Sequence, residues 1–114
     1  LVLFCIGKKT SCLAACAQGS AFIVNVLSEQ QKHLSEAFAR KEHDKFAGVD
    51  FTIGGNGCRV LTGCLATLEC SRVDTYEGGD HLIVIGRVER MALADEAAPL
   101  LRYCARYHRI GAEA

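Results

Sequence analysis

The stretch Gly78-Gly79-Asp80-His81, with the apolar run that follows it, constrains the fold of this chain more than any other feature. Glycine adopts positive φ without steric cost and aspartate can hydrogen-bond to its own backbone, so these residues predict a tight turn. The run Leu82-Ile83-Val84-Ile85 is β-branched or aliphatic throughout and predicts a strand that is buried at its start. The sequence therefore predicts a strand over 81–91 that begins directly after a turn.

The segment before this turn predicts a second strand, over 64–73. Small or apolar side chains alternate along it and would share its inward face: Cys64, Ala66, Leu68 and Cys70. Residues 77–80 would connect the two strands, which favours an antiparallel pair. His81 then stands at the mouth of the second strand. Its side chain could contact a ligand, since histidine titrates near neutral pH, or it could simply end the hairpin.

The first half of the chain predicts two strands and two helices. We expect strands over 1–6 and 21–27, with a short helix over 12–18 between them that ends near Gly19. Thr10 or Ser11 would supply its N-cap. The pattern Ser28-x-x-Gln31 is a capping box and predicts a longer helix to about Lys41.

The second half is mostly turns and strands, with a loop over 54–57 and an ambiguous segment over 97–110 in which Pro99 starts a new element. The fold class is therefore mainly β with two helices, and sequential antiparallel strands of this kind close into a small barrel or pack as a sandwich. We expect one domain over 1–114. The chain opens on an apolar strand without methionine, so we expect a preceding N-terminal portion to be absent from this sequence.

Composition narrows the function classes. Thirteen basic residues balance thirteen acidic ones, which argues against a nucleic-acid-binding surface. No apolar run approaches the length of a membrane span. Seven cysteines cannot all pair within one monomer, and they predict reduced thiols in a cytoplasmic protein. Cys12 and Cys16 lie one helical turn apart, but they lack the further ligands of a zinc site, so we expect no metal.

Two segments could bind a phosphorylated, aromatic ligand. Lys8-Lys9-Thr10-Ser11 joins a strand to a helix, where free amides, hydroxyls and positive charge suit a phosphate, although an ordinary N-cap beside two solvated lysines has the same sequence. Residues 102–109 alternate basic and aromatic side chains, which can stack on a flat ligand or can equally form a solvated strand. Because no nucleophile has an evident base, the features favour a protein that positions a cofactor.

Six motifs in this order and at these separations resemble the flavin reductase domain family, across nearly the whole chain. They are Leu1-Val2-Leu3-Phe4-Cys5, Phe22-x-Val24-Asn25-Val26-Leu27, Asp44-Lys45-Phe46-Ala47-Gly48, Gly63-x-Leu65-Ala66-x-Leu68-Glu69-Cys70, Gly78-Gly79-Asp80-His81 and Pro99-Leu100-Leu101. The chain looks like the reductase component of two-component flavin-dependent monooxygenases acting on phenols, hydroxyphenylacetate or steroid-derived rings. The resemblance implies an FMN-binding split β-barrel, lacking its N-terminal segment, that works as a homodimer.

The resemblance also implies roles for particular residues. FMN or FAD would be lined by Cys5, Ile6 and Gly7, with its phosphate at Thr10, Ser11 and Cys12 and with Ala37 and Phe38 against it. His81 would be the catalytic residue, near the flavin ring and the nicotinamide of NADH or NADPH. The nucleotide would approach Arg102, Tyr103, Cys104 and Ala105.

That last segment departs from the family pattern of aromatic-Tyr-Arg-Gly, since Arg102, Cys104 and Ala105 replace three of its four residues. The resemblance implies an NAD(P)H:flavin oxidoreductase that supplies reduced flavin to a partner oxygenase in aromatic or steroid-ring catabolism. Because of the departure, two alternatives stay open: a flavin-binding electron carrier without a nicotinamide site, and an inactive fragment.

Overall fold

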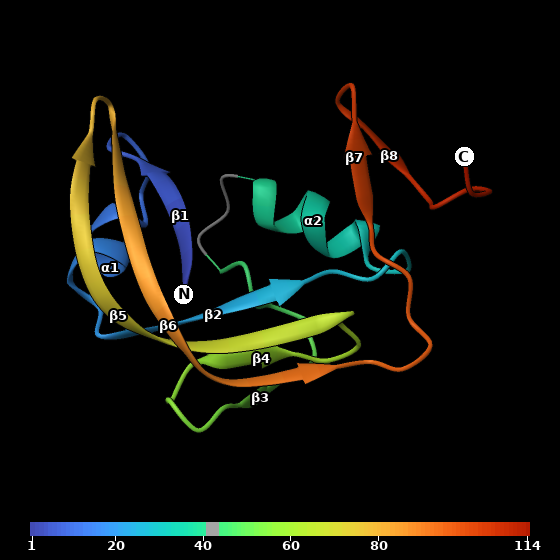
Figure 1. Ribbon diagram of the computed structural model, residues 1–114, viewed down its shortest axis with the longest axis horizontal. Coiled ribbons are helices and arrows are strands. Elements are labelled where there is room, and N and C mark those ends of the chain that lie inside the picture. Colours follow the sequence, from blue (N-terminus) through green and yellow to red (C-terminus); the bar gives the residue numbers. More distant parts are fainter. Residues whose placement is uncertain (41–43) are drawn as a thin grey trace. The chain divides into compact units, whose positions relative to one another are not determined.

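The computed structural model describes residues 1–40 and 44–114 (Figure 1). Its elements run in the order β1 (Val2–Gly7), α1 (Leu13–Gln18), β2 (Ala21–Val26), α2 (Lys32–Ala39), β3 (Phe51–Ile53), β4 (Arg59–Leu61), β5 (Ala66–Gly78), β6 (His81–Leu93), β7 (Leu101–Tyr103) and β8 (Arg106–His108). The chain forms two compact units. The first comprises Leu1–Val24, Ile53–Arg59 and Leu68–Met91, and the second comprises Asn25–Thr52, Val60–Thr67 and Ala92–Ala114. The single domain over 1–114 stays a prediction.

A four-stranded sheet in the order β1-β6-β5-β2 dominates the first unit. Figure 1 shows β5 and β6 as a long, curved hairpin, and its turn consists of Gly79 and Asp80. Gly79 has φ +66°, which confirms the predicted glycine turn. β5 begins at Ala66, so the expected strand start at Cys64 is wrong by two residues, and Cys64 is buried just before the strand.

The core of the first unit forms where small residues let aromatic rings approach the sheet. Val84 and Cys70 are fully buried. The ring of Phe22 packs edge-on against Phe4, with centroids 5.1 Å apart. A Cβ built on Gly86 would lie 2.3 Å from the Phe22 ring, so only glycine fits on β6 at this point.

The second unit packs helix α2 on an apolar cluster. Leu34, Leu61 and Cys64 are its buried members, and four half-buried side chains pack against them: Leu27, Phe38, Phe46 and Val49. The Phe46 ring makes edge-to-face contacts with Phe38 at 5.1 Å and with Phe51 at 5.7 Å. Leu34 and Phe38, four residues apart, therefore face the cluster from the same side of α2.

Both predicted helix starts need correction. The N-cap of α1 is Cys12, not Thr10 or Ser11, and it makes no side-chain capping bond. The N-cap of α2 is Gln31, so Ser28 lies three residues before the cap. The Gln31 side chain nevertheless accepts a hydrogen bond from the Ser28 backbone amide at 2.9 Å, which is one half of the predicted capping box. α2 ends at Ala39, and Lys41, its expected end, lies outside the described residues.

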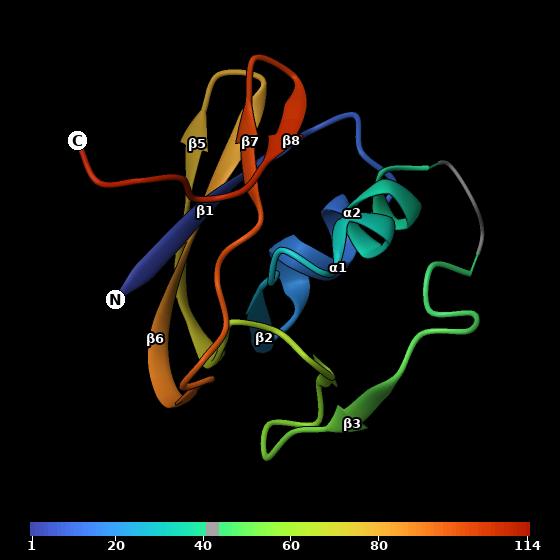
Figure 2. The ribbon, with the colours of Figure 1, turned by 90° about the vertical axis from the view of Figure 1, so that its right-hand side faces the viewer.

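The ambiguous segment over 97–110 folds into a short hairpin of β7 and β8, which Figure 2 shows as two antiparallel strands. Pro99 forms an isolated bridge with Ser28 just before this hairpin. Neither α1 nor α2, the helices of the described ranges, is long and apolar enough to cross a membrane. All seven cysteines are free thiols.

Candidate functional site

The pairing of β1 with β6 brings the first group of candidate residues together. The strands are antiparallel, with Gly7 opposite His81, Ile6 opposite Leu82 and Cys5 opposite Ile83. Beyond the last pair, the Lys8 amide donates a hydrogen bond to the Asp80 carbonyl at 2.9 Å. The loop after β1 is therefore fixed to the turn of the β5–β6 hairpin. Residues that are far apart in sequence form one surface here.

His81 is oriented by its neighbour in the turn. Its Nδ1 lies 2.8 Å from the Asp80 carboxylate, and the imidazole is about half exposed, at 47%. The hydrogen bond from His81 and its positive charge when protonated lower the pKa of Asp80, with smaller contributions from the backbone and Lys8. An ionised Asp80 can only accept, so Nδ1 carries the proton of the neutral ring, and Nε2 faces Gly7.

Gly7 leaves space between two candidate ligand contacts. A Cβ built there would stand 3.6 Å from the Thr10 methyl and 3.7 Å from His81 Nε2. These are ordinary van der Waals distances, so a methyl group would fill the space without a clash. We call this methyl-sized space between Thr10 and His81, at the end of β1, the cradle.

The loop after β1 holds the three residues predicted to bind phosphate. The Thr10 hydroxyl donates to the Gly7 carbonyl at 2.8 Å, within the turn that precedes the N-cap of α1 at Cys12. The Cys12 thiol lies 3.9 Å from the Thr10 hydroxyl oxygen, and the Ser11 side chain is exposed. Because its hydrogen is donated to Gly7, the Thr10 hydroxyl can only accept a further hydrogen bond. Ser11 and backbone amides are therefore the donors left for an anion.

The second unit holds the remaining candidates. Ala37 and Phe38 lie on α2, where Phe38 lines an apolar pocket of about 320 Å³ that includes Leu27, Leu34 and Leu61. Arg102, Tyr103, Cys104 and Ala105 form the tip of the β7–β8 hairpin, and their side chains are exposed. The structure thus groups Cys5, Ile6, Gly7, Thr10, Ser11, Cys12 and His81 in one unit, and the other six in the second.

Tyr107 ties the β7–β8 hairpin to α2. Its hydroxyl donates to Ser35 at 2.9 Å. The Arg102 guanidinium lies 5.4 Å from the centre of the Tyr107 ring, and Lys32 lies 5.6 Å from it. Tyr107 is half-buried by these contacts, whereas Tyr103 is 71% exposed. Of these two tyrosines, Tyr103 is the one exposed to a ligand, and its ring contacts only the edge of His108, at 6.0 Å.

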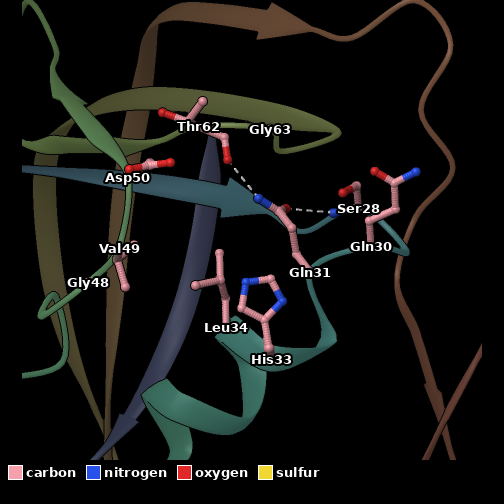
Figure 3. Close-up of a pocket in the computed structure, with 10 residues that line it drawn as sticks. All are labelled: Ser28, Gln30, Gln31, His33, Leu34, Gly48, Val49, Asp50, Thr62 and Gly63. Atoms are coloured by element: carbon pink, nitrogen blue, oxygen red, sulfur yellow. Dashed lines mark hydrogen bonds between the residues drawn. The ribbon is translucent and has the colours of Figure 1, made fainter.

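Sequence reasoning missed a polar pocket of about 270 Å³ beside α2 (Figure 3). Gln31 lies in its wall, where its side chain accepts from the Ser28 amide and donates to the Thr62 carbonyl at 2.8 Å. His33 and Asp50 also line this pocket. The capping-box pattern signalled Gln31, but its bond to Thr62 depends on tertiary structure.

Comparison with known proteins places these features in a family. Residues 1–111 match the flavin reductase like domain. The chain is 41% identical over 107 residues to the flavin-dependent monooxygenase reductase subunit HsaB of Rhodococcus jostii, covering 94% of this chain and 55% of that protein. It is 40% identical over 115 residues to HsaB of Mycobacterium tuberculosis, covering 99% of this chain and 62% of that protein. The chain thus spans between half and two thirds of these relatives.

Comparison with solved structures supports the same family assignment. The NADH:FAD oxidoreductase SgcE6 of Streptomyces globisporus, in complex with NAD and FAD fragments, superposes with a TM-score of 0.92 at 31% identity, over 98% of this chain and 68% of that one. Nitrilotriacetate monooxygenase component B of Mycobacterium thermoresistibile gives a TM-score of 0.90 at 37% identity, over 96% and 62%. The predicted mainly β fold of the split-barrel class, with two helices, is confirmed. The chain belongs to the flavin reductase like domain family.

Proposed function

We propose that this protein is an NAD(P)H-dependent flavin reductase that supplies reduced FMN or FAD to a separate monooxygenase component. The observation that carries the proposal is the β1–β6 register, which sets Gly7 opposite His81 and leaves a cradle between His81 and Thr10. The relatives support the same reaction, since one is a reductase subunit and another was solved with NAD and FAD fragments.

We propose that the flavin ring lies over the end of β1, against the cradle. A bound flavin supplies the acceptor for the hydride of the nicotinamide. The backbone of Cys5, Ile6 and Gly7 would line its ring, because Gly7 has no side chain to keep the ring away. Ser11 and the backbone near Cys12 would donate to its phosphate, and Thr10 would fix the loop by its bond to Gly7.

His81 would act as a hydrogen-bonding and orienting residue, not as a nucleophile. Asp80 holds the proton on Nδ1, so Nε2 is presented towards the cradle as an acceptor when the ring is neutral. A protonated ring would instead donate from Nε2. In either state the contact with Asp80 orients the His81 imidazole. An oriented imidazole can in turn help to align the flavin with the nicotinamide.

The nucleotide would approach the β7–β8 tip. Tyr103 offers an exposed ring, and Arg102 offers a cation held over Tyr107. Ala37 and Phe38 of α2 are the remaining residues that we propose to contact the flavin. NADH and NADPH both remain candidates, since the proposed contacts do not separate them.

We place the protein in the cytoplasm as a homodimer that passes reduced flavin to an oxygenase acting on aromatic or steroid-derived rings. Free thiols support a reducing compartment. The HsaB relatives support the oxygenase partner.

The direct test is to follow the loss of NADH and NADPH absorbance with added FMN or FAD. We expect flavin-dependent oxidation of at least one nucleotide, and no oxidation in any combination would overturn the proposal. A second function, flavin binding without nucleotide oxidation, is favoured by Cys104 and Ala105 at the β7–β8 tip. Quenching of flavin fluorescence by a protein that leaves both nucleotides unoxidised would establish it.

A further inference from the structure

We propose that Cys12 and Cys16 form a dithiol that hydrogen peroxide oxidises to a disulfide, and that this disulfide reshapes the start of α1. No role in flavin reduction requires Cys16, and Cys12 enters the proposed function only through the phosphate loop. The chemistry of the pair can therefore be examined separately from catalysis. Its effect on flavin rests on the proposed function.

The two thiols lie together at the start of α1. Cys12 is the N-cap, Cys16 is four residues later, and the Cys16 amide donates to the Cys12 carbonyl at 3.1 Å. Their side chains are close enough to hydrogen-bond, and the Cys12 thiol is exposed while Cys16 is half-buried. Burial raises the pKa of Cys16, and its contact with Cys12 raises that pKa further.

Closing a disulfide requires α1 to change shape. Cβ atoms four residues apart on a helix are about 5–6 Å apart, whereas a disulfide brings them to about 3.5–4.5 Å. α1 has six residues, no buried side chain and no side-chain cap, so its first turn can rewind at small cost. Cys12 would move towards Cys16 and away from its contact with Thr10.

The oxidation balances with peroxide as the electron acceptor. The thiolate of the exposed Cys12 attacks one peroxide oxygen, the O–O bond breaks, and a sulfenic acid forms with release of hydroxide. The Cys16 thiolate then attacks that sulfur, the S–S bond forms, and a second hydroxide leaves. The protons of the two thiols convert both hydroxides to water. Reduced flavin that meets oxygen before an oxygenase does generates peroxide, so a flavin reductase produces this oxidant beside its own loop.

Tryptic mapping of the peroxide-treated protein tests the pair directly. Trypsin cleaves after Lys9 and Lys32, and the peptide between them contains Cys12 and Cys16 and no other cysteine. After alkylation in denaturant, we expect this peptide to be unalkylated, lighter by two hydrogens, and restored by dithiothreitol. The peptide over 60–72 is the matched control: its two thiols, Cys64 and Cys70, are buried, and both should be alkylated.

The conformational step has its own measurement. Hydrogen exchange of the α1 amides should accelerate on oxidation in the wild type and stay unchanged in Cys16→Ser. Flavin affinity, measured by fluorescence quenching, should fall about tenfold in the oxidised wild type and stay constant in peroxide-treated Cys16→Ser.

Each outcome decides one part. Full alkylation of Cys12 and Cys16, or stable oxidation of Cys12 alone, overturns the disulfide. A disulfide that leaves both amide exchange and flavin affinity unchanged overturns the reshaping of α1. Absence of flavin binding in the reduced protein contradicts the proposed function instead, while the peptide masses and the exchange rates still judge the dithiol.

Discussion

The β5–β6 and β7–β8 hairpins each reverse direction in two residues, but with opposite chemistry. The β5–β6 turn places glycine at its positive-φ position, Gly79 at +66°. The β7–β8 turn places Cys104 at +48° and Ala105 at +62°, where L side chains crowd the backbone. The first turn is favoured by its own sequence. The second depends on its strands and on Tyr107 to hold a conformation that its residues disfavour.

The two turns both present a proposed ligand-contacting side chain, but they differ in how well their own residues favour the turn conformation. The β5–β6 turn supports an oriented histidine on a relaxed backbone. The β7–β8 turn presents Tyr103 on a strained one, and strain at such sites is retained only when surrounding contacts fix it. The conformation of the β7–β8 turn, where we propose that the nicotinamide nucleotide binds, is therefore less strongly favoured by its own sequence than that of the β5–β6 turn.

The largest effect should come from His81→Ala, which removes the ligand-facing group of the β5–β6 turn. We expect kcat/KM for flavin reduction to fall by about 100-fold, in the range of a positioned hydrogen-bonding or proton-transfer group. Steady-state kinetics measure it, with His33→Ala on the exposed start of α2 as the matched control. Equal kinetics in His81→Ala and the wild type would remove the role given to this turn.

Gly7→Ala should fill the cradle opposite His81. Because the new methyl group meets Thr10 and His81 at ordinary contact distances, the free energy of unfolding should change little. Flavin affinity should nevertheless weaken by about tenfold, equivalent to about 1.4 kcal/mol. Fluorescence quenching and urea unfolding measure the two quantities. A variant that binds flavin like the wild type would show that the ring lies elsewhere.

Exchanging alanine and glycine between the turns tests the strain directly. Gly79→Ala should lower the free energy of unfolding by about 1 kcal/mol, and Ala105→Gly should raise it by a few tenths up to about 1 kcal/mol. The urea midpoint measures both, provided the slope of the transition is unchanged. Changes of the same sign in the two variants would contradict the contrast between the turns.

The smallest effect concerns Asp80. Its pKa in the folded protein lies below the ordinary 3.8, so its ionised form stabilises the fold. This contribution is fully present above pH 3.8 and is lost as the pH falls through the lowered pKa. The stability difference between wild type and Asp80→Asn should therefore shrink on acidification through this range. Urea midpoints across the acid range measure it, and a difference that grows instead would reverse the assigned sign.

Much of the fold could be predicted where local chemistry and tertiary contacts agree. The Gly78–His81 turn, the opening strand and the end of α1 near Gly19 are fixed by residues that favour those conformations. The helix starts were wrong because the residues with capping side chains lie in turns just before the helices, whose N-caps are Cys12 and Gln31. Thr10 donates to Gly7 within the first of these turns, and such a local turn has the same sequence signal as a cap.

The candidate site also has a part that the sequence indicates and a part that it does not. The sequence indicates both strands, but the pairing of Gly7 with His81 depends on the register of β1 on β6, which only the structure gives. The β7–β8 hairpin was unpredictable, because Cys104 and Ala105 carry no turn signal. The roles of all these residues remain proposals.

Because the Phe22 ring lies directly against Gly86, we expect substitutions at these two positions to depend on each other. A side chain at Gly86 is tolerable only if Phe22 first becomes smaller, so single changes at Gly86 should be purged, while paired exchanges could survive. A library that randomises both positions together should recover functional double variants that neither site yields alone.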